Sequence, residues 1–401
     1  MIFAKRAIAG PQIGCAEIDP GRNEALIYGK LLVVGLGLAL FAAAPAHAGD
    51  ARHLSVASGL PENHQALKIF RQGFQSEIKR RAAEAELGEI VWDETHAGTL
   101  SHFGGVLEAV EDDLAMFGIV SVNHETRRLP LQDMTFHAPF TTESCRIVGN
   151  AYHANHQTLD GMTSSLDSAR QRYLSAIPVD AYNFISVRKI RNLDDVRGLQ
   201  IGVTDRIDGW LDGVDGIPVR LRPDLVAARI EAGVLVGALL PNTEMKRLGL
   251  KKLADHYTRT GFGAQVPFIV TVNARAFATL PKSLREIIQD VANDFVPMAG
   301  AEYCAAGADA LDDLKKQGIG TAKLLKSRRI QWAESLSPLA QAWALRNDKA
   351  GLPGTAAIAA YMNHMKVAKV TVTRDWSLPA PKGALQKMTA PADEISQVPA
   401  R

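Results

Sequence analysis

The amino-acid sequence predicts an α/β protein with two successive sets of strands and helices, and three observations support this. Short apolar strands alternate with helices whose apolar residues recur three and four positions apart. This alternation begins near residue 53 and begins again near residue 182. The 353 residues that follow Ala48 exceed the size at which a single core stops growing, about 250–300 residues. We therefore expect two α/β domains.

The first set opens with an alternating strand at 53–59, followed by a loop and a helix. The apolar residues on one face of this helix are Leu67, Phe70, Phe74 and Ile78. A second strand is predicted at 88–94 and a third in the nearly continuous apolar run 114–122. Such runs suit parallel strands that are covered on both faces.

The second set has predicted strands at 182–187, 199–204 and 216–221, and a helix at 223–231. Between the two sets, residues 151–174 are polar and helix-like. A domain boundary or a crossover is expected in this segment.

A strand at 268–273 is followed by a long predicted helix at 281–316, which Gly318 ends. Pro281 suits the first turn, whereas Pro297 lies inside the helix and is expected to kink or divide it. A helix of this length spans about 54 Å at 1.5 Å per residue, more than the width of one small domain. It is therefore long enough to connect two domains.

The chain begins with features of a secretory signal peptide. An uncharged apolar run at 31–44 follows Lys30 and leads to the small residues before Ala48, where we expect cleavage. The run is shorter than the ~20 residues that cross a bilayer, so an uncleaved anchor is the weaker alternative. We assign residues 1–48 to the leader and its upstream segment. The proline-rich tail 378–401 has no apolar period and is expected to be disordered.

Charge and cysteine content exclude some classes of protein. Without the leader's four basic and three acidic residues, the net charge falls from +2 to +1. A nucleic-acid-binding protein needs a denser basic face, so no nucleic-acid partner is expected. Cys145 and Cys304 are the only cysteines after the leader. They could pair in an exported protein, but a chain of this length needs no such crosslink, and we favour two unpaired buried cysteines.

The histidines and short motifs do not assemble a catalytic or metal site. Only His153 and His156 have a spacing that could place two imidazoles on one helical face, and no cysteine or carboxylate pattern completes a metal site around them. No GxSxG motif follows the leader. We therefore expect a protein that is no enzyme and has no cofactor, metal or catalytic residue, with a secreted hydrolase as the weaker alternative.

Two segments of the second set resemble the substrate-binding proteins of TRAP transporters. Residues 191–203 read RNLDDVRGLQIGV, where that family has the form DLKGLKIRV, and 228–241 read ARIEAGVLVGALLP, where the family has ALQTGVVDGQENP. The matching residues are Asp195, Gly198, Leu199, Ile201, Val203, Gly233, Val234, Gly237 and Pro241. Segments 55–64, 254–262 and 268–288 agree in order and spacing, so the resemblance covers more than half of the chain.

The resemblance implies a two-lobed periplasmic-binding-protein fold, with a ligand cleft between the lobes and a long helix that spans both. Lobe 1 would comprise residues 49–178 and about 268–310, and lobe 2 residues 179–267 and about 311–377. The implied function is that of a periplasmic receptor that captures a small organic solute, with organic acids among the candidates, by hinge closure. Its implied partners are the TRAP membrane subunits, which it would serve as a monomer. A periplasmic sensor subunit with the same fold is the alternative.

The chain departs from the family where the ligand's carboxylate is usually held. Gly202 occupies the position of the family's arginine, and its lack of a side chain is expected to leave room on the cleft wall. Tyr182 replaces a second arginine of some relatives, and Leu240 replaces the family's asparagine. Arg206, four residues beyond Gly202, is a candidate for a relocated anion contact, although a surface arginine is the commoner outcome.

Loops after the strands of the first set supply further candidates for ligand binding. Asn63 and His64 follow the first strand, His96 the second and Asn123 the third. Loops at the carboxyl ends of parallel strands line the crevice in open α/β folds. The alternative for each is a solvated loop residue or a helix cap, a role that Asn63 would suit.

Overall fold

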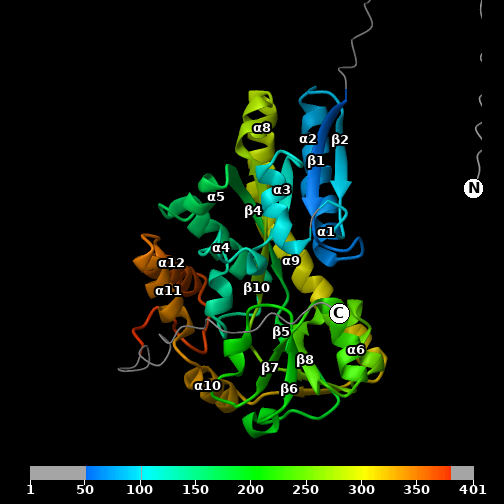
Figure 1. Ribbon diagram of the computed structural model, residues 1–401, viewed down its shortest axis with the longest axis vertical. Coiled ribbons are helices and arrows are strands. Elements are labelled where there is room, and N and C mark those ends of the chain that lie inside the picture. Colours follow the sequence, from blue (N-terminus) through cyan, green and yellow to red (C-terminus); the bar gives the residue numbers. More distant parts are fainter. Residues whose placement is uncertain (1–50, 101, 381–401) are drawn as a thin grey trace, which may run out of the picture. The chain divides into compact units, whose positions relative to one another are not determined.

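The computed structural model describes residues 51–100 and 102–380, which belong to one structural unit (Figure 1). The predicted leader 1–48, its cleavage after Ala48, and the tail from residue 381 onward lie outside the described residues. Among the helices of the described part, none is both long and apolar enough to span a bilayer.

A five-stranded mixed sheet is built mainly on the first set of strands, in the order β2-β1-β3-β10-β4. Its strands are β1 Arg52–Ser58, β2 Ile90–Thr95, β3 Phe117–Ser121, β4 Gln171–Val179 and β10 Gln265–Asn273. β1 runs parallel to β2 and β3, whereas β10 runs antiparallel to β3 and β4. The strands predicted in the first set and at 268–273 are therefore confirmed, within a few residues at their ends.

The helical layer over this sheet begins with the predicted amphipathic helix. It consists of α1 Gln65–Ile69, a π-helical turn Phe70–Gln75 and α2 Ser76–Glu84. Its four predicted core residues are buried. A Cβ atom on Gly73 would lie 1.9 Å from Met298 Cε, so this turn packs directly on the long helix α9, Lys282–Lys316. The other helices that accompany the first sheet are α3 Val106–Glu111, α4 Cys145–Thr158, α5 Ser164–Ser168 and α8 Ala274–Thr279. α3 packs on the opposite face of the sheet from the π-helical turn, since Gly118 faces α3 whereas Phe117 contacts Phe74.

A second, six-stranded sheet has the order β11-β9-β5-β8-β6-β7. Its strands are β5 Tyr182–Ser186, β6 Gln200–Val203, β7 Ile217–Arg220, β8 Gly237–Pro241, β9 His256–Arg259 and β11 Gly320–Lys323. β5 is antiparallel to both of its neighbours, and the other pairs are parallel. The three strands predicted in the second set are confirmed. The helices α6 Val226–Glu231 and α7 Asn242–Arg247 precede and follow β8.

Three connections join the two sheets of this two-lobed fold. β4 leads directly into β5, and β9 leads back through residues 260–264 into β10. The third connection is α9, Lys282–Lys316, which contacts α4 beside the first sheet and α7 beside the second (Figure 1). Pro297 does not divide α9, contrary to one of the two predicted outcomes. Phe295 and Val296 before it and Ala299 and Gly300 after it are buried, so tertiary packing stabilises the helix on both sides of the proline.

Three further helices follow β11: α10 Lys326–Ser335, α11 Leu339–Lys349 and α12 Gly354–Val367. α12 packs on α4, and α11 contacts the turn Met134–His137. The indoles of Trp332 and Trp343 are buried and donate hydrogen bonds to Trp210 O and Asp133 Oδ1 at 2.8 Å each. The exact lobe boundaries proposed from the sequence stay a prediction.

Cys145 and Cys304 form a disulfide, so the favoured expectation of unpaired cysteines is wrong. The two Cα atoms lie 5.8 Å apart. Cys145 begins α4 and Cys304 lies within α9, and these helices pack closely: a Cβ atom on Gly300 would lie 2.6 Å from Arg146 Cα. Two residues 159 positions apart in the sequence are thus brought together by helix packing.

Candidate ligand-binding site

A cavity of about 720 Å³ is lined by residues from both sheets. Most of its walls come from loops at the carboxyl ends of β1, β2 and β3 of the first sheet and of β6, β7 and β8 of the second. Open α/β folds bind ligands at this edge. Such a volume accommodates a small organic molecule.

His64 forms part of the wall on the side of the first sheet. As the N-cap of α1, it accepts a hydrogen bond at Nδ1 from the Ala66 N–H, 3.2 Å away. The ring proton must then be on Nε2, which lies 3.3 Å from Glu244 Oε1 across the cavity. Burial lowers the pKa of His64, although Glu244 opposes the shift. The imidazole is therefore neutral at pH 7 and presents an N–H donor to the second lobe.

Two stacked rings form another part of the cavity wall. Phe103 stacks on the ring of His124, with centroids 5.2 Å apart and an interplanar angle of 20°. His124 Nδ1 is 2.9 Å from Ser121 Oγ, and burial lowers the pKa of this histidine. These three residues line the cavity. A planar, partly apolar ligand has a suitable contact surface here.

Glu244 and Arg247 on α7 form a half-buried charged pair on the opposite wall. Arg247 Nε donates to Oε1 at 2.9 Å, and Nη2 donates to Oε2 at 2.6 Å. Burial alone would raise the pKa of Glu244, but His64 and Arg247 hold it below its usual value. The bonds to Glu244 use Nε and Nη2, so the Nη1 group of Arg247 remains available to an anionic ligand.

Asp205 provides a second carboxylate on the second-lobe side of the cavity. Its Oδ2 accepts a hydrogen bond from Tyr182 Oη at 2.6 Å, and its Oδ1 accepts one from Asn123 Nδ2 at 2.7 Å. Burial raises the pKa of Asp205 against these hydrogen bonds. Asp205 forms no ion pair within the described part of the chain. The bond from Asn123, at the end of β3, links the two lobes directly.

The structure brings two of the predicted site residues to the cavity wall, His64 and Tyr182. Asn123 lies behind the wall and binds Asp205. Asn63 is exposed and outside the cavity, and it does not cap the helix, because His64 takes that role. His96 is also outside the cavity, buried with its Nε2 2.5 Å from Glu94 Oε2.

The other predicted site residues lie away from the cavity lining. Arg206 is exposed, and Leu240 is buried within the apolar core of the second sheet. The open space expected beside Gly202 is absent. A Cβ atom there would lie 2.9 Å from Leu235 Cδ1 and 3.4 Å from Leu221 Cδ2. These leucines fill the region into which an arginine at position 202 would extend.

Sequence reasoning missed Asp205, Glu244 and Arg247. Asp205 follows β6 and Glu244 follows β8. The expectation that ligand-binding residues lie after the ends of strands, which was used for the first set, would also have identified these two residues in the second set. Arg247 lies one helical turn beyond Glu244, the spacing of a pair on one helical face. Among the described residues, no group of three or more potential ligands could hold a metal ion.

A family model and several solved structures match this chain, and all of them describe solute-binding proteins or receptors. Residues 62–347 match the model of the family described as bacterial extracellular solute-binding protein, family 7. A TRAP periplasmic solute-binding protein from Desulfovibrio salexigens shares 19% sequence identity, with a TM-score of 0.70 over 78% of this chain and 95% of that one. An extracytoplasmic solute receptor of Bordetella pertussis that binds pyroglutamic acid shares 18%, with a TM-score of 0.66 over 78% and 99%.

A third similar structure comes from a marine metagenome. It is a TRAP solute-binding protein specific for aromatic acid ligands, in complex with 3-hydroxybenzoate. It shares 19% sequence identity, with a TM-score of 0.70 over 79% of this chain and 98% of that one. At these identities the structural likeness concerns the fold.

Proposed function

Because the chain belongs to family 7 of the bacterial extracellular solute-binding proteins, a family of receptors, we propose that it delivers a small organic acid to a TRAP-type transporter without catalysing a reaction. The observation that carries the proposal is the cavity of about 720 Å³ between the two sheets. Its walls offer the Nη1 group of Arg247 and the aromatic surface of Phe103. These groups suit an acid with a planar or apolar body.

Hinge closure is the proposed mode of capture. The walls come from both lobes, and the connections at 179–182, 260–264 and in α9 are where the lobes could move relative to each other. Asn123–Asp205 and His64–Glu244 are contacts that would form as the lobes close. The proposed lobes follow the boundaries given above, which lie within three residues of the connections at 179–182 and 260–264.

The proposed location and partners follow from the same family. The leader 1–48 would direct export and be cut after Ala48, and a monomer in the periplasm would dock on the TRAP membrane subunits. Genes for two membrane subunits beside this gene support transport, whereas a kinase gene there supports the sensor alternative.

A thermal-shift screen tests ligand capture. The purified protein is heated with a panel of small carboxylic acids, including 3-hydroxybenzoate and pyroglutamate, and with the corresponding amides. A ligand that binds only the folded state stabilises it by about 2.7 kcal/mol at a concentration of 100 times Kd, so a true ligand raises Tm. The receptor proposal fails if no compound in a broad library raises Tm while a panel of hydrolase substrates shows turnover.

Gly104→Phe tests whether the ligand occupies this cavity. Gly104 lines the cavity, and a Cβ atom there meets only His124, at 3.7 Å, so a side chain can be added without displacing the backbone. We expect the phenyl ring to fill part of the cavity and weaken binding at least tenfold, about 1.4 kcal/mol. Gly104→Ala is the matched control and should bind as the wild type does. Equal affinity in the phenylalanine variant, measured by titration calorimetry, would place the ligand elsewhere.

A further inference from the structure

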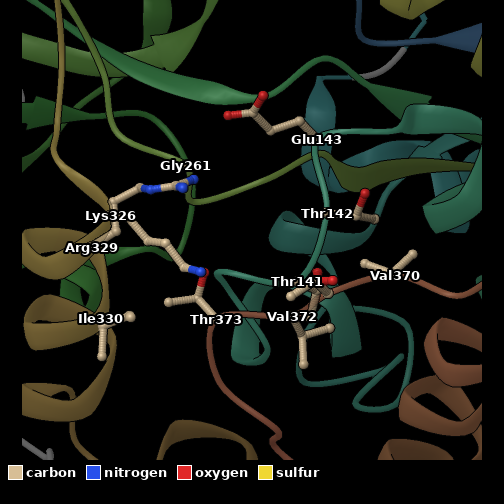
Figure 2. Close-up of a pocket in the computed structure, with 11 residues that line it drawn as sticks. Thr141, Thr142, Glu143, Gly261, Lys326, Arg329, Ile330, Val370, Val372 and Thr373 are labelled. Carbon is tan, nitrogen blue, oxygen red and sulfur yellow. The ribbon is translucent and has the colours of Figure 1, made fainter.

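A second cavity, of about 620 Å³, lies away from the ligand-binding site and shares no lining residue with it. Three parts of the chain form its walls: Thr141–Glu143 before α4, the first turns of α10, and residues 370–373 after α12. Gly261 completes it (Figure 2). Gly261 belongs to the connection from β9 to β10, so the cavity adjoins one of the crossings between the lobes.

Two basic side chains of this cavity have no partner. Figure 2 shows Arg329 extending from α10 toward Gly261, and Lys326 extending toward Thr373. Neither side chain forms an ion pair or a hydrogen bond with any residue between 51 and 380 that the structure describes. Arg329 Nε is buried and lacks an acceptor, which is costly for a guanidinium N–H. The cavity therefore contains an unsatisfied positive site.

The one carboxylate on the rim does not neutralise these cations. Glu143 is paired with Arg259, whose Nε donates to Oε1 at 3.0 Å. The backbone of Gly261 admits the guanidinium of Arg329, because a Cβ atom there would lie 2.9 Å from Nη1, and its φ of +85° favours glycine. The guanidinium of Arg329 therefore lies against the β9–β10 connection at the cavity wall.

The rest of the wall is suited to an organic anion. Thr141 is 5% exposed, and its Oγ1 makes no hydrogen bond of normal geometry, although the Tyr361 hydroxyl lies near it. Ile330, Val370 and Val372 add an apolar surface. A guanidinium and an ammonium beside apolar side chains match a carboxylate that is attached to a hydrocarbon body.

We propose that this cavity is a second binding site, for a small organic carboxylate, with Lys326 and Arg329 as its anion contacts. The occupant touches the β9–β10 connection directly. It also contacts residues 141–143, where Thr142 O accepts a hydrogen bond from the Ala264 N–H of that connection, and residues 370–373, where the Thr373 N–H donates to Phe140 O.

Titration calorimetry with cyclohexanecarboxylate tests the proposal, and its uncharged amide serves as the control ligand. The titrations use the Gly104→Phe protein, whose first cavity is partly filled, so that binding at the second site is measured separately. We expect saturable binding of the acid, at least tenfold weaker binding of the amide, and loss of the acid's binding in Lys326→Gln and in Arg329→Gln. Lys326 is exposed, so its replacement leaves the fold intact.

Arg328→Gln is the matched control variant, because Arg328 lies on the same helix, is exposed and does not line the cavity. It should bind as the parent protein does. The proposal is overturned if the acid does not bind at millimolar concentration, if the amide binds equally well, or if Lys326→Gln has no effect. None of these results bears on ligand capture at the first cavity, which the Gly104 variants test independently.

Discussion

Removal of the Cys145–Cys304 disulfide is expected to lower the free energy of unfolding by about 2–5 kcal/mol. The bond closes a segment in which the two residues are 159 positions apart, and a long closed loop restricts the unfolded chain strongly. It also ties the start of α4 to α9, the helix that contacts both lobes. Urea denaturation of the wild type and of the Cys145→Ala/Cys304→Ala variant measures the difference.

Reduction provides an internal control for this prediction. Dithiothreitol should destabilise the wild type to the level of the double variant and leave the double variant unchanged. Cys15, the third cysteine, lies in the predicted leader and would be absent from the exported protein. A wild type that keeps its full stability in reductant, with its thiols shown to be free, would contradict the prediction.

Some strands were predictable from their apolar runs, but no strand was expected at β4 or β8, although β8 is buried along its whole length. β3 and β10 are buried along their whole length, and their apolar runs, FGIV and VPFIV, account for the prediction. β9 and β11 read HYTR and GTAK, with no apolar run, and owe their conformation to pairing with each other and with β5. Tertiary pairing of this kind leaves no local signal.

The candidate site was predictable only in part, for a related reason. His64 and Tyr182 were found because they follow strands or match a family position. The space beside Gly202 depends on Leu221 and Leu235, which come from other parts of the second lobe and fill it. The disulfide likewise depends on how closely α4 approaches α9. The filled space beside Gly202 and the disulfide both depend on contacts between segments that are distant in the sequence. Such contacts cannot be predicted from local patterns in a single sequence.

Asp180 lies where β4 passes into β5, at one of the crossings between the lobes. It is 3% exposed. Its Oδ2 accepts a hydrogen bond from the Asn242 N–H at 2.7 Å, and its Oδ1 accepts one from Thr243 Oγ1 at 2.6 Å. It therefore holds the first turn of α7, the helix that carries Glu244 and Arg247. Gly307 of α9 packs against it, since a Cβ atom there would lie 2.6 Å from Asp180 Cβ.

The stability of the protein is expected to fall as pH rises through the titration of Asp180. Burial raises the pKa of Asp180 to about 7, against the hydrogen bonds that it accepts, from an ordinary value of 3.8. Between these two values the folded state retains a proton that the unfolded state has lost, so the proton's stabilising effect is full below about pH 4 and gone above about pH 7. At about 1.4 kcal/mol per pH unit, the loss reaches at most about 4 kcal/mol.

Asp180→Asn isolates this contribution, because asparagine does not titrate and occupies the same volume. Other buried groups such as Glu125, whose pKa burial also raises to about 7, are present in both proteins and cancel in the comparison. The free energy of unfolding of the wild type minus that of the variant should therefore decrease between pH 4 and pH 8, when both are measured by urea denaturation. A difference that is constant or increases with pH would show that Asp180 is ionised in the folded protein, with its charge stabilised by the first turn of α7.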